Sequence, residues 1–205
     1  MSRLKIPKKS TVCMALGLLL MAAALMLMLC NQWAEARARA SAEEVLEEWQ
    51  SKVEKPEHEA SWQPTEYEAF PDREMPVLEI NGQLYIGTLE IPALELTLPV
   101  MSQWSYTNLN IAPCRYQGTV YKDNLVIAAH NYWSHFGRLK NLLAGDEIIF
   151  TDADGNHYSY QVMEQETVEP MEIDRMCTGD WDLTLFTCTY GGQTRLALRC
   201  GRSGE

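Results

Sequence analysis

Hydrophobic residues are distributed unevenly along this 205-residue chain, and one stretch near its start contains little else. Residues 11–30 (TVCMALGLLLMAAALMLMLC) carry no charge, and as a helix they would span roughly 30 Å, the thickness of the hydrocarbon core of a bilayer. The preceding residues 1–10 carry four basic side chains and no acidic one. Because positive flanks stay on the cytoplasmic side, the pattern predicts a cytoplasmic segment at 1–10 and a transmembrane signal anchor at 11–30.

Two other interpretations of the apolar run stay open. A cleavable signal peptide would use the small-residue pattern Ala36-Arg37-Ala38, although the run exceeds the usual signal-peptide core of about 7–15 residues. Lipidation at Cys30 would need a small preceding residue, whereas Leu29 is large. We therefore expect a single-pass protein of the cell membrane whose folded part is extracellular.

Residues 31–76 have the pattern of a spacer with one helix. Ser41 is a typical N-cap, and the segment 41–55 places apolar residues at helical spacing, at Val45, Leu46, Trp49 and Val53. Pro56 would end this helix, and the residues after it mix acids, prolines and aromatics without a clear period. We expect a helical and irregular extracellular stalk, with docking of this segment onto the folded domain as the alternative.

From residue 77 the pattern changes to short strands separated by turns. Asn81-Gly82 and Asp154-Gly155 each predict a hairpin, the second one within residues 147–162. Strand patterns occupy residues 77–80, 83–91, 94–100, 124–129, 182–187 and 195–200. A short amphipathic helix is predicted at 135–144, with an apolar face formed by Phe136, Leu139 and Leu143. About eight strands and little helix predict a mostly β fold, a closed or nearly closed β-barrel over residues 77–205.

Charge and metal-ligand patterns exclude several functions. The formal net charge is −11, and residues 31–205 hold 15 more acidic than basic residues, which argues against a nucleic-acid partner. The cysteine spacing shows no zinc pattern, and a disulfide among Cys114, Cys177 and Cys200 is left open. Residues 152–155 lack most ligands of a calcium loop and predict a turn. We expect no cofactor and leave calcium dependence open.

Cys188 lies where a predicted strand runs into a glycine-containing loop. Partial exposure and a nearby basic residue would favour a thiolate nucleophile there, and the alternative is an inert core cysteine. His130 ends a wholly apolar strand, so its ring should emerge at a strand terminus, where it could exchange a proton with Cys188 and protonate a leaving amine. His135 is the competing histidine, and we expect it to face solvent at the start of a helix.

Arg195 opens the strand that follows the short loop 189–194. The strands that flank so short a loop should be neighbours, which brings Arg195 near Cys188, where a guanidinium could stabilise an oxyanion. Strand alternation places Arg199 on the same face as Arg195. Arg199 and Arg202 nevertheless suit ordinary surface positions.

These residues resemble the signature of the sortase family. TLFTC at 184–188 matches the sortase TLxTC motif, whose last residue is the nucleophile, and NLVIAAH at 124–130 resembles the strand that ends in the family's catalytic histidine. Arg195 stands where the family has its arginine. The segments 85–100 and 145–150 resemble further strands, so the resemblance covers roughly residues 77–202.

The resemblance implies an eight-stranded sortase β-barrel with one or two short helices, in which His130, Cys188 and Arg195 are catalytic. It also implies a transpeptidase that cleaves an LPXTG-like sorting signal of secreted proteins through a cysteine acyl-enzyme. The acceptor would be an amine on a peptidoglycan precursor or a pilin subunit. The lack of an apolar run after residue 200 and the short stretch 168–183 favour a housekeeping or specialised enzyme over a pilin polymerase.

Three other functions stay open as alternatives. A peptidoglycan cross-linking cysteine transpeptidase would show an SHGC-type motif, which this sequence lacks. A papain-like protease would have its cysteine before its histidine, which is the reverse of the order seen here. The third alternative is an anchored β-barrel binding module in which Cys188 is inert.

Overall fold

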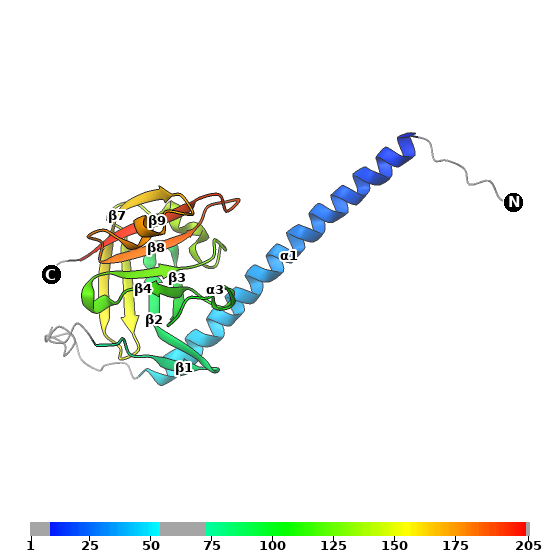
Figure 1. The fold of residues 1–205 in the computed structure, drawn as a ribbon. Helices are drawn as coiled ribbons and strands as arrows, with labels where there is room; N and C mark the ends of the chain where they lie inside the picture. Colours follow the sequence, from blue (N-terminus) through cyan, green and yellow to red (C-terminus); the bar gives the residue numbers. More distant parts are fainter. Residues whose placement is uncertain (1–8, 54–72, 204–205) are drawn as a thin grey trace. The chain divides into compact units, whose positions relative to one another are not determined.

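The computed structural model describes residues 9–53 and 73–203, and the chain divides into two compact units, residues 1–37 and 38–205 (Figure 1). Helix α1 (Lys9–Lys52) is unbroken. Its apolar part is a candidate membrane span by length and composition, and the large apolar side chains of this part are exposed. The predicted helix start at Ser41 is wrong, because the alanine-rich residues before it favour helix and nothing there ends it.

Nine strands form one sheet in the part of the second unit that the structure describes. They are β1 (Leu78–Ile80), β2 (Gln83–Ile91), β3 (Leu96–Met101), β4 (Cys114–Gln117), β5 (Leu125–Ala128), β6 (Glu147–Asp152), β7 (His157–Val168), β8 (Leu183–Cys188) and β9 (Arg195–Arg202). Their order is β1-β2-β3-β4-β5-β8-β9-β7-β6, and β6 also pairs with β2. The eight strands β2 to β9 therefore close into the predicted barrel, and β1 lies outside the ring (Figure 1).

Short helices connect the strands. They are α3 (Tyr106–Leu109), α4 (Ile173–Cys177) and the 3-10 helices η1 (Pro92–Leu94), η2 (Val120–Lys122) and η3 (Phe136–Asn141). The predicted helix at 135–144 corresponds to η3, but the assignment of Leu143 to its apolar face is wrong. A 3-10 helix repeats every three residues, so Phe136, Leu139 and Leu142 are buried, whereas Leu143 is 72% exposed.

Both predicted hairpins are present. Asn81 and Gly82 join β1 to β2 with φ of 51° and 73°, the left-handed conformations that a two-residue type I′ turn requires. The β6–β7 hairpin is organised by buried Asp152, whose carboxylate accepts the backbone N–H groups of Asp154 and Asn156 at 3.0 and 2.9 Å. Residues 152–155 are thus a turn, as predicted. Among the described residues, no group of three or more His, Cys, Asp or Glu side chains is placed to hold a metal ion.

Two apolar clusters lie on opposite sides of the barrel wall. One set of alternating residues on β5, β8 and β9 points inward into the barrel core, including Ile127, Leu185 and Leu198. The other set points outward into a second cluster, which includes Ala128, Phe186 and Ala197. We call this second cluster the outer cluster; α3 and α4 contribute Leu109 and Met176 to it.

The end of α1 packs on this outer cluster. Val45 and Trp49 are buried in it, each worth about 1.5–3 kcal/mol of transfer free energy. Lys52 donates to the backbone carbonyl of Glu79 at 3.0 Å, which ties the helix end to β1. Of the two interpretations of residues 31–76, docking therefore describes residues 38–53, while the predicted end at Pro56 falls outside the described residues.

Candidate active site

Three adjacent strands bring the predicted catalytic residues to one end of the barrel wall. β8 lies between β5, with which it runs parallel, and β9, with which it runs antiparallel. Cys188 is the partner of Arg195 in the β8–β9 ladder. Ala128 is the partner of Phe186 in the β5–β8 ladder, so His130 and Cys188, each two residues further on, lie at the same level.

The three side chains project from the outer face of the barrel. The residues two positions further into each strand are Ala128, Phe186 and Ala197, which all belong to the outer cluster. Because side chains alternate along a strand, residues two positions apart share a face. Cys188 is accordingly partly exposed, and a substrate can approach its thiol from solvent.

The other cysteines of the barrel differ from Cys188 in their surroundings. Cys114 and Cys200 are buried, and burial raises the pKa of each thiol to about 12. Burial also raises the pKa of the partly exposed Cys177. All six cysteines of the chain are free, so none of the disulfides left open is formed here. A thiolate at neutral pH is therefore disfavoured at the three other barrel cysteines.

His130 is held at the end of β5 by backbone bonds on both sides. The carbonyl of the preceding Ala129 accepts the hydroxyl of Thr187 at 2.9 Å, and the carbonyl of His130 accepts the N–H of Phe136 at 3.1 Å. Its ring is partly exposed, and burial lowers the pKa of His130 below its usual value. The backbone of His130 is thus fixed at the level of Cys188 on the neighbouring strand, and its imidazole is a group that can give or take a proton there.

Asn110 is a residue of this site that the sequence did not reveal. Its Oδ1 lies 3.2 Å from Nε2 of His130, and its Nδ2 donates to the carbonyl of Tyr106 at 3.1 Å. Because an amide oxygen only accepts, the contact is made by a tautomer of His130 with a proton on Nε2. Asn110 follows α3 in a stretch with no strand or helix periodicity, so no local pattern pointed to it.

His135 lies inside the molecule, and the expectation that it faces solvent is wrong. Its N–H donates to the carbonyl of Tyr132 at 3.0 Å, so the loop after β5 doubles back and turns the ring inward. Burial, with the nearby charge of His130, lowers the pKa of His135 to about 4. The ring centroid of Tyr132 lies 4.9 Å from that of His130 and 5.6 Å from that of His135. His130 is therefore the histidine that a substrate can reach.

Arg195 stands at the head of β9 after a tight loop. Gly191 and Gly192 have φ of 86° and 72°, which favours glycine, and the N–H of Thr189 donates to the carbonyl of Thr194 at 2.9 Å. Nη1 of Arg195 donates to the carbonyls of Gly192 and Thr194, both at 3.1 Å. Nη1 makes both of the hydrogen bonds that this guanidinium forms with the described residues. Nε and Nη2 can therefore donate to a substrate oxygen.

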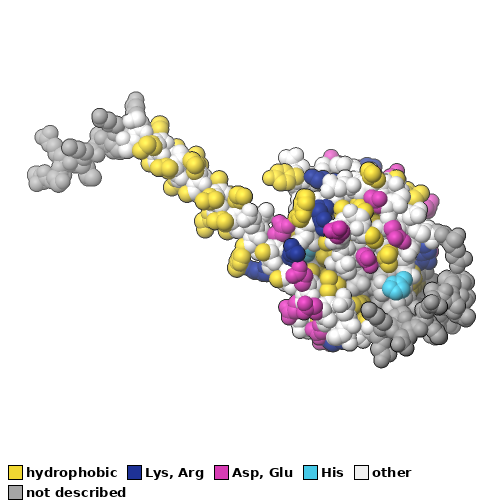
Figure 2. Space-filling view, turned by 180° about the vertical axis from the view of Figure 1, so that it is seen from behind, with side chains coloured by type: hydrophobic (Ala, Val, Ile, Leu, Met, Phe, Trp, Pro, Cys, Tyr) yellow, Lys and Arg dark blue, Asp and Glu magenta, His cyan; other side chains and the backbone are white. Residues whose placement is uncertain are grey.

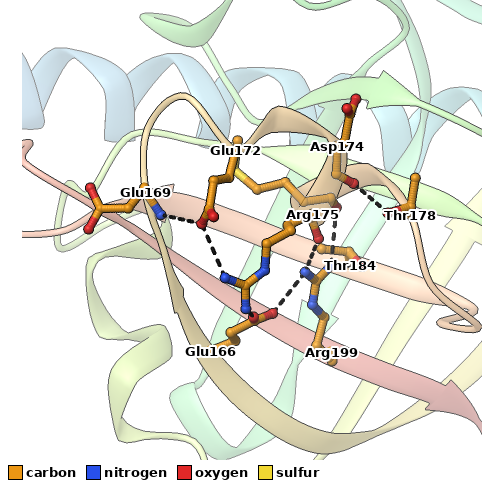
Figure 3. Close-up of polar contacts among 9 residues, drawn as sticks. Glu166, Glu169, Glu172, Asp174, Arg175, Thr178, Thr184 and Arg199 are labelled. Atoms are coloured by element: carbon orange, nitrogen blue, oxygen red, sulfur yellow. Dashed lines mark hydrogen bonds and ion pairs between the residues drawn. The ribbon is translucent and has the colours of Figure 1, made fainter.

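Arg199 is buried, and its expected surface position is wrong. It is on the same face of β9 as Arg195, but α4 covers it, so that its side chain is 2% exposed. Figure 3 shows its guanidinium directed at α4 and the neighbouring strands. Its hydrogen-bond acceptors are the carboxylate of Glu166 at 3.0 Å, the hydroxyl of Thr184 at 3.2 Å, the carbonyl of Met176 at 3.1 Å and the carbonyl of Arg175.

The bonds of Arg199 fasten α4 to the barrel. Two of its acceptors are carbonyls at the end of α4, where a helix dipole favours a positive charge. Glu166 also forms an ion pair with the guanidinium of Arg175. Burial raises the pKa of the Glu166 carboxyl, but the two arginines lower it by more, so that the pKa lies below its usual value. Arg202 is partly exposed and pairs with Asp123 at 3.1 Å, so its expected surface position is confirmed.

The fold is that of the cysteine transpeptidases that the sequence resembles. The Sortase domain model matches residues 89–202, which is more than half of the chain. The chain therefore belongs to the sortase family, and it is an enzyme of the cysteine transpeptidase class. A binding module with an inert Cys188 is not supported.

Several solved structures are similar to this chain. A Clostridium perfringens sortase C with the C-terminal cell wall sorting motif is 28% identical to this chain. The match covers 59% of this chain and 71% of that one, with a TM-score of 0.52. A Streptococcus pneumoniae sortase C is 26% identical, with coverage of 62% and 72% and a TM-score of 0.53. Sortase C1 of GBS pilus island 1 is 23% identical, with coverage of 62% and 68% and a TM-score of 0.53, and shows the fold. No curated protein matches the chain.

Proposed function

We propose that this sortase cleaves an LPXTG-like sorting signal through an acyl-enzyme on Cys188 and transfers the acyl group to an amine. The observation that carries the proposal is the alignment of Cys188 with His130 on one side and Arg195 on the other. The similar Clostridium perfringens sortase C, solved with its C-terminal cell wall sorting motif, supports a sorting signal as the substrate. The similar solved structures are sortases C, whereas the sequence favoured a housekeeping or specialised enzyme over a pilin polymerase. The subclass therefore stays a prediction.

In the first half-reaction the Cys188 thiolate attacks the carbonyl carbon of the Thr–Gly bond. The C–S bond forms as the carbonyl electron pair moves onto oxygen, and Arg195 stabilises the resulting oxyanion with directed N–H donors. The C–N bond then breaks. Protonated His130 gives its proton to the departing glycine amine, which leaves a thioester on Cys188 and a neutral imidazole.

In the second half-reaction an acceptor amine replaces the glycine. The amine attacks the thioester carbonyl, and neutral His130 takes the proton that the new amide must lose. Collapse of the tetrahedral intermediate expels the Cys188 thiolate and regenerates the starting enzyme. The acceptor is an amine on a peptidoglycan precursor or on a pilin subunit, because both are substrates available outside the membrane.

We place the barrel on the extracellular side, attached through residues 11–30. The apolar run with its basic flank at 1–10 supports this orientation. Protease added to intact protoplasts should then release the barrel into the medium. A mature protein that begins at Arg39 or Ser41 would instead identify residues 11–30 as a cleaved signal peptide.

The test of the chemistry uses the full-length chain in detergent. It is incubated with a peptide library built around LPXTG, quenched in acid, and measured by intact-protein and peptide mass spectrometry. We expect an adduct of the acyl fragment on Cys188, and a new amide product when triglycine is added as the amine. Cys188→Ala is the control. Absence of an adduct with every peptide would overturn the proposal.

A further inference from the structure

Four aromatic rings form a continuous row on the outer face of the barrel that ends beside Cys188. Ring centroids are 5.3 Å apart between Phe186 and Tyr116, 5.6 Å between Tyr116 and Trp104, and 5.1 Å between Trp104 and Tyr106. Phe186 precedes Cys188 by two residues on the same face of β8. We call these four residues the aromatic row; it leads from the nucleophile across β4 to α3.

The far end of the aromatic row is open to solvent. Tyr106 is 76% exposed and Trp104 is 38% exposed, whereas Tyr116 is partly buried and Phe186 is buried. Adjacent exposed rings on a folded domain mark a place where apolar groups of a partner can pack, because their burial is favourable and their edge-to-face geometry offers open ring faces.

The backbone under the exposed rings is held in place. The guanidinium of Arg115 donates to the carbonyl of Ser102 at 3.0 Å, and the side chain of Asn108 donates to the carbonyl of Gln103 at 2.9 Å. Asn110, which contacts His130, donates to the carbonyl of Tyr106 at 3.1 Å. A platform that is already ordered loses little entropy when a ligand binds to it.

The charge around the aromatic row selects the kind of ligand. Acidic side chains are scattered over the face of the barrel shown in Figure 2, yet residues 96–122, which carry three of the four rings, contain no acidic residue. The charged residues of this stretch are the basic Arg115 and Lys122, so the row lies in a part of an acidic domain that has no acidic residue of its own. It fits an extended segment that carries proline, aromatic or aliphatic side chains, which pack on aromatic faces.

Building on the proposed function, we propose that the aromatic row binds the residues of the substrate that precede its sorting motif. His130 protonates the departing amine at the strand ends, so the acyl half of the substrate extends the other way, past the edge of the buried Phe186 and toward Tyr116. The four residues of an LPXT segment, extended at about 3.3 Å each, cover roughly 13 Å. Phe186, two strand residues from Cys188, lies about 7 Å from it, and Tyr116 lies one ring further along the row. The four residues of the motif therefore end near Tyr116, and the substrate residues that precede the motif contact Trp104 and Tyr106.

The experiment compares three peptides that share the motif cleaved by the full-length chain in detergent. The first has glycine and serine before the motif, the second has proline and tyrosine there, and the third has proline and tyrosine after it. We expect kcat/KM for the second peptide to exceed that for the first by about tenfold, mainly through KM, because stacking adds binding that is equal in the ground and transition states. The third should match the first.

Variants identify the row as the source of the difference. In Tyr106→Ala and Trp104→Ala the advantage, taken as the ratio of kcat/KM for the second peptide to that for the first within each variant, should fall below about threefold. Leu143→Ala, which removes a similarly exposed apolar side chain, should retain the full advantage. An advantage that persists in both row variants, or that belongs to the third peptide, would overturn the inference. Failure to cleave any peptide would instead contradict the proposed function itself.

Discussion

Oδ1 of Asn110 lies 3.2 Å from Nε2 of His130, although the two residues are 20 positions apart in the sequence. The other side of the same amide donates to the carbonyl of Tyr106, which fixes the oxygen toward the imidazole. Asn110 therefore positions the ring of His130 and selects the tautomer that carries a proton on Nε2. The same amide also anchors the start of α3, which carries the exposed end of the aromatic row.

Asn110→Asp should move the pH dependence of kcat/KM upward. A carboxylate beside the imidazole stabilises its charged form, so the pKa of His130, which burial lowers in the wild type, should rise. Asn110→Ala removes the hydrogen bond without adding charge, and it should lower kcat by about tenfold with no upward shift. Peptide cleavage measured from pH 5 to 9 separates the two. Identical pH profiles for Asn110→Asp and wild type would argue against this contact.

Cys188 should be the barrel cysteine that reacts fastest with a thiol reagent at neutral pH. It is partly exposed, whereas Cys114 and Cys200 are buried with pKa values raised to about 12. Pulse labelling with iodoacetamide followed by peptide mapping measures each rate. Cys188→Ala should abolish peptide cleavage in a folded chain, while Cys177→Ala should retain most activity. Cleavage by Cys188→Ala would remove this residue from the reaction.

Arg195→Ala should lower turnover by about 10²–10³, the usual cost of removing one oxyanion donor. Arg195→Lys keeps the charge but loses the planar donor geometry, so it should recover only part of the loss. Steady-state peptide cleavage measures both. Lys140→Ala, which removes an exposed positive charge elsewhere on the barrel, is the control and should change little. Near-normal turnover in Arg195→Ala would exclude the oxyanion role.

Arg199→Ala should destabilise the barrel. It leaves the α4 carbonyls without their buried donor, which costs about 1–3 kcal/mol for an unsatisfied group, while Glu166 keeps its ion pair with Arg175. Arg199→Met keeps most of the volume and should therefore lose less stability than Arg199→Ala, because it leaves a smaller cavity. Urea unfolding in detergent, followed by tryptophan fluorescence, gives the free energies. Wild-type stability in Arg199→Ala would contradict the network in Figure 3.

His135 should make the folded state sensitive to acid. Its pKa is about 4 in the folded chain and 6.5 as the reference for the unfolded chain, so only the unfolded chain binds a proton between these values. The stabilisation is present above pH 6.5 and is lost as the pH falls toward 4. Between pH 7 and 4.5 the wild type should lose about 2 kcal/mol more than His135→Phe. Equal losses in the two proteins, by urea unfolding, would refute this.

Local sequence patterns were sufficient for the parts of the protein whose physics is local. The uncharged run at 11–30, the Asn81-Gly82 turn and the alternation of β8 and β9 each depend on neighbouring residues, and a short loop makes its two strands adjacent. For that reason the pairing of Cys188 with Arg195 was predictable before the fold was known. The position of His130 depended on the same logic, since it ends an apolar strand.

Tertiary structure decided what covers each face. Alternation placed Arg199 on the outer face of β9, but only the packing of α4 made that position buried. His135 turned inward because the loop after β5 folds back, and Asn110 reached His130 because α3 lies beside β5 in space. The sequence of a strand determines which side chains share a face. Whether that face meets water, a helix or a substrate depends on elements far away in the chain, and these distant contacts assembled the site.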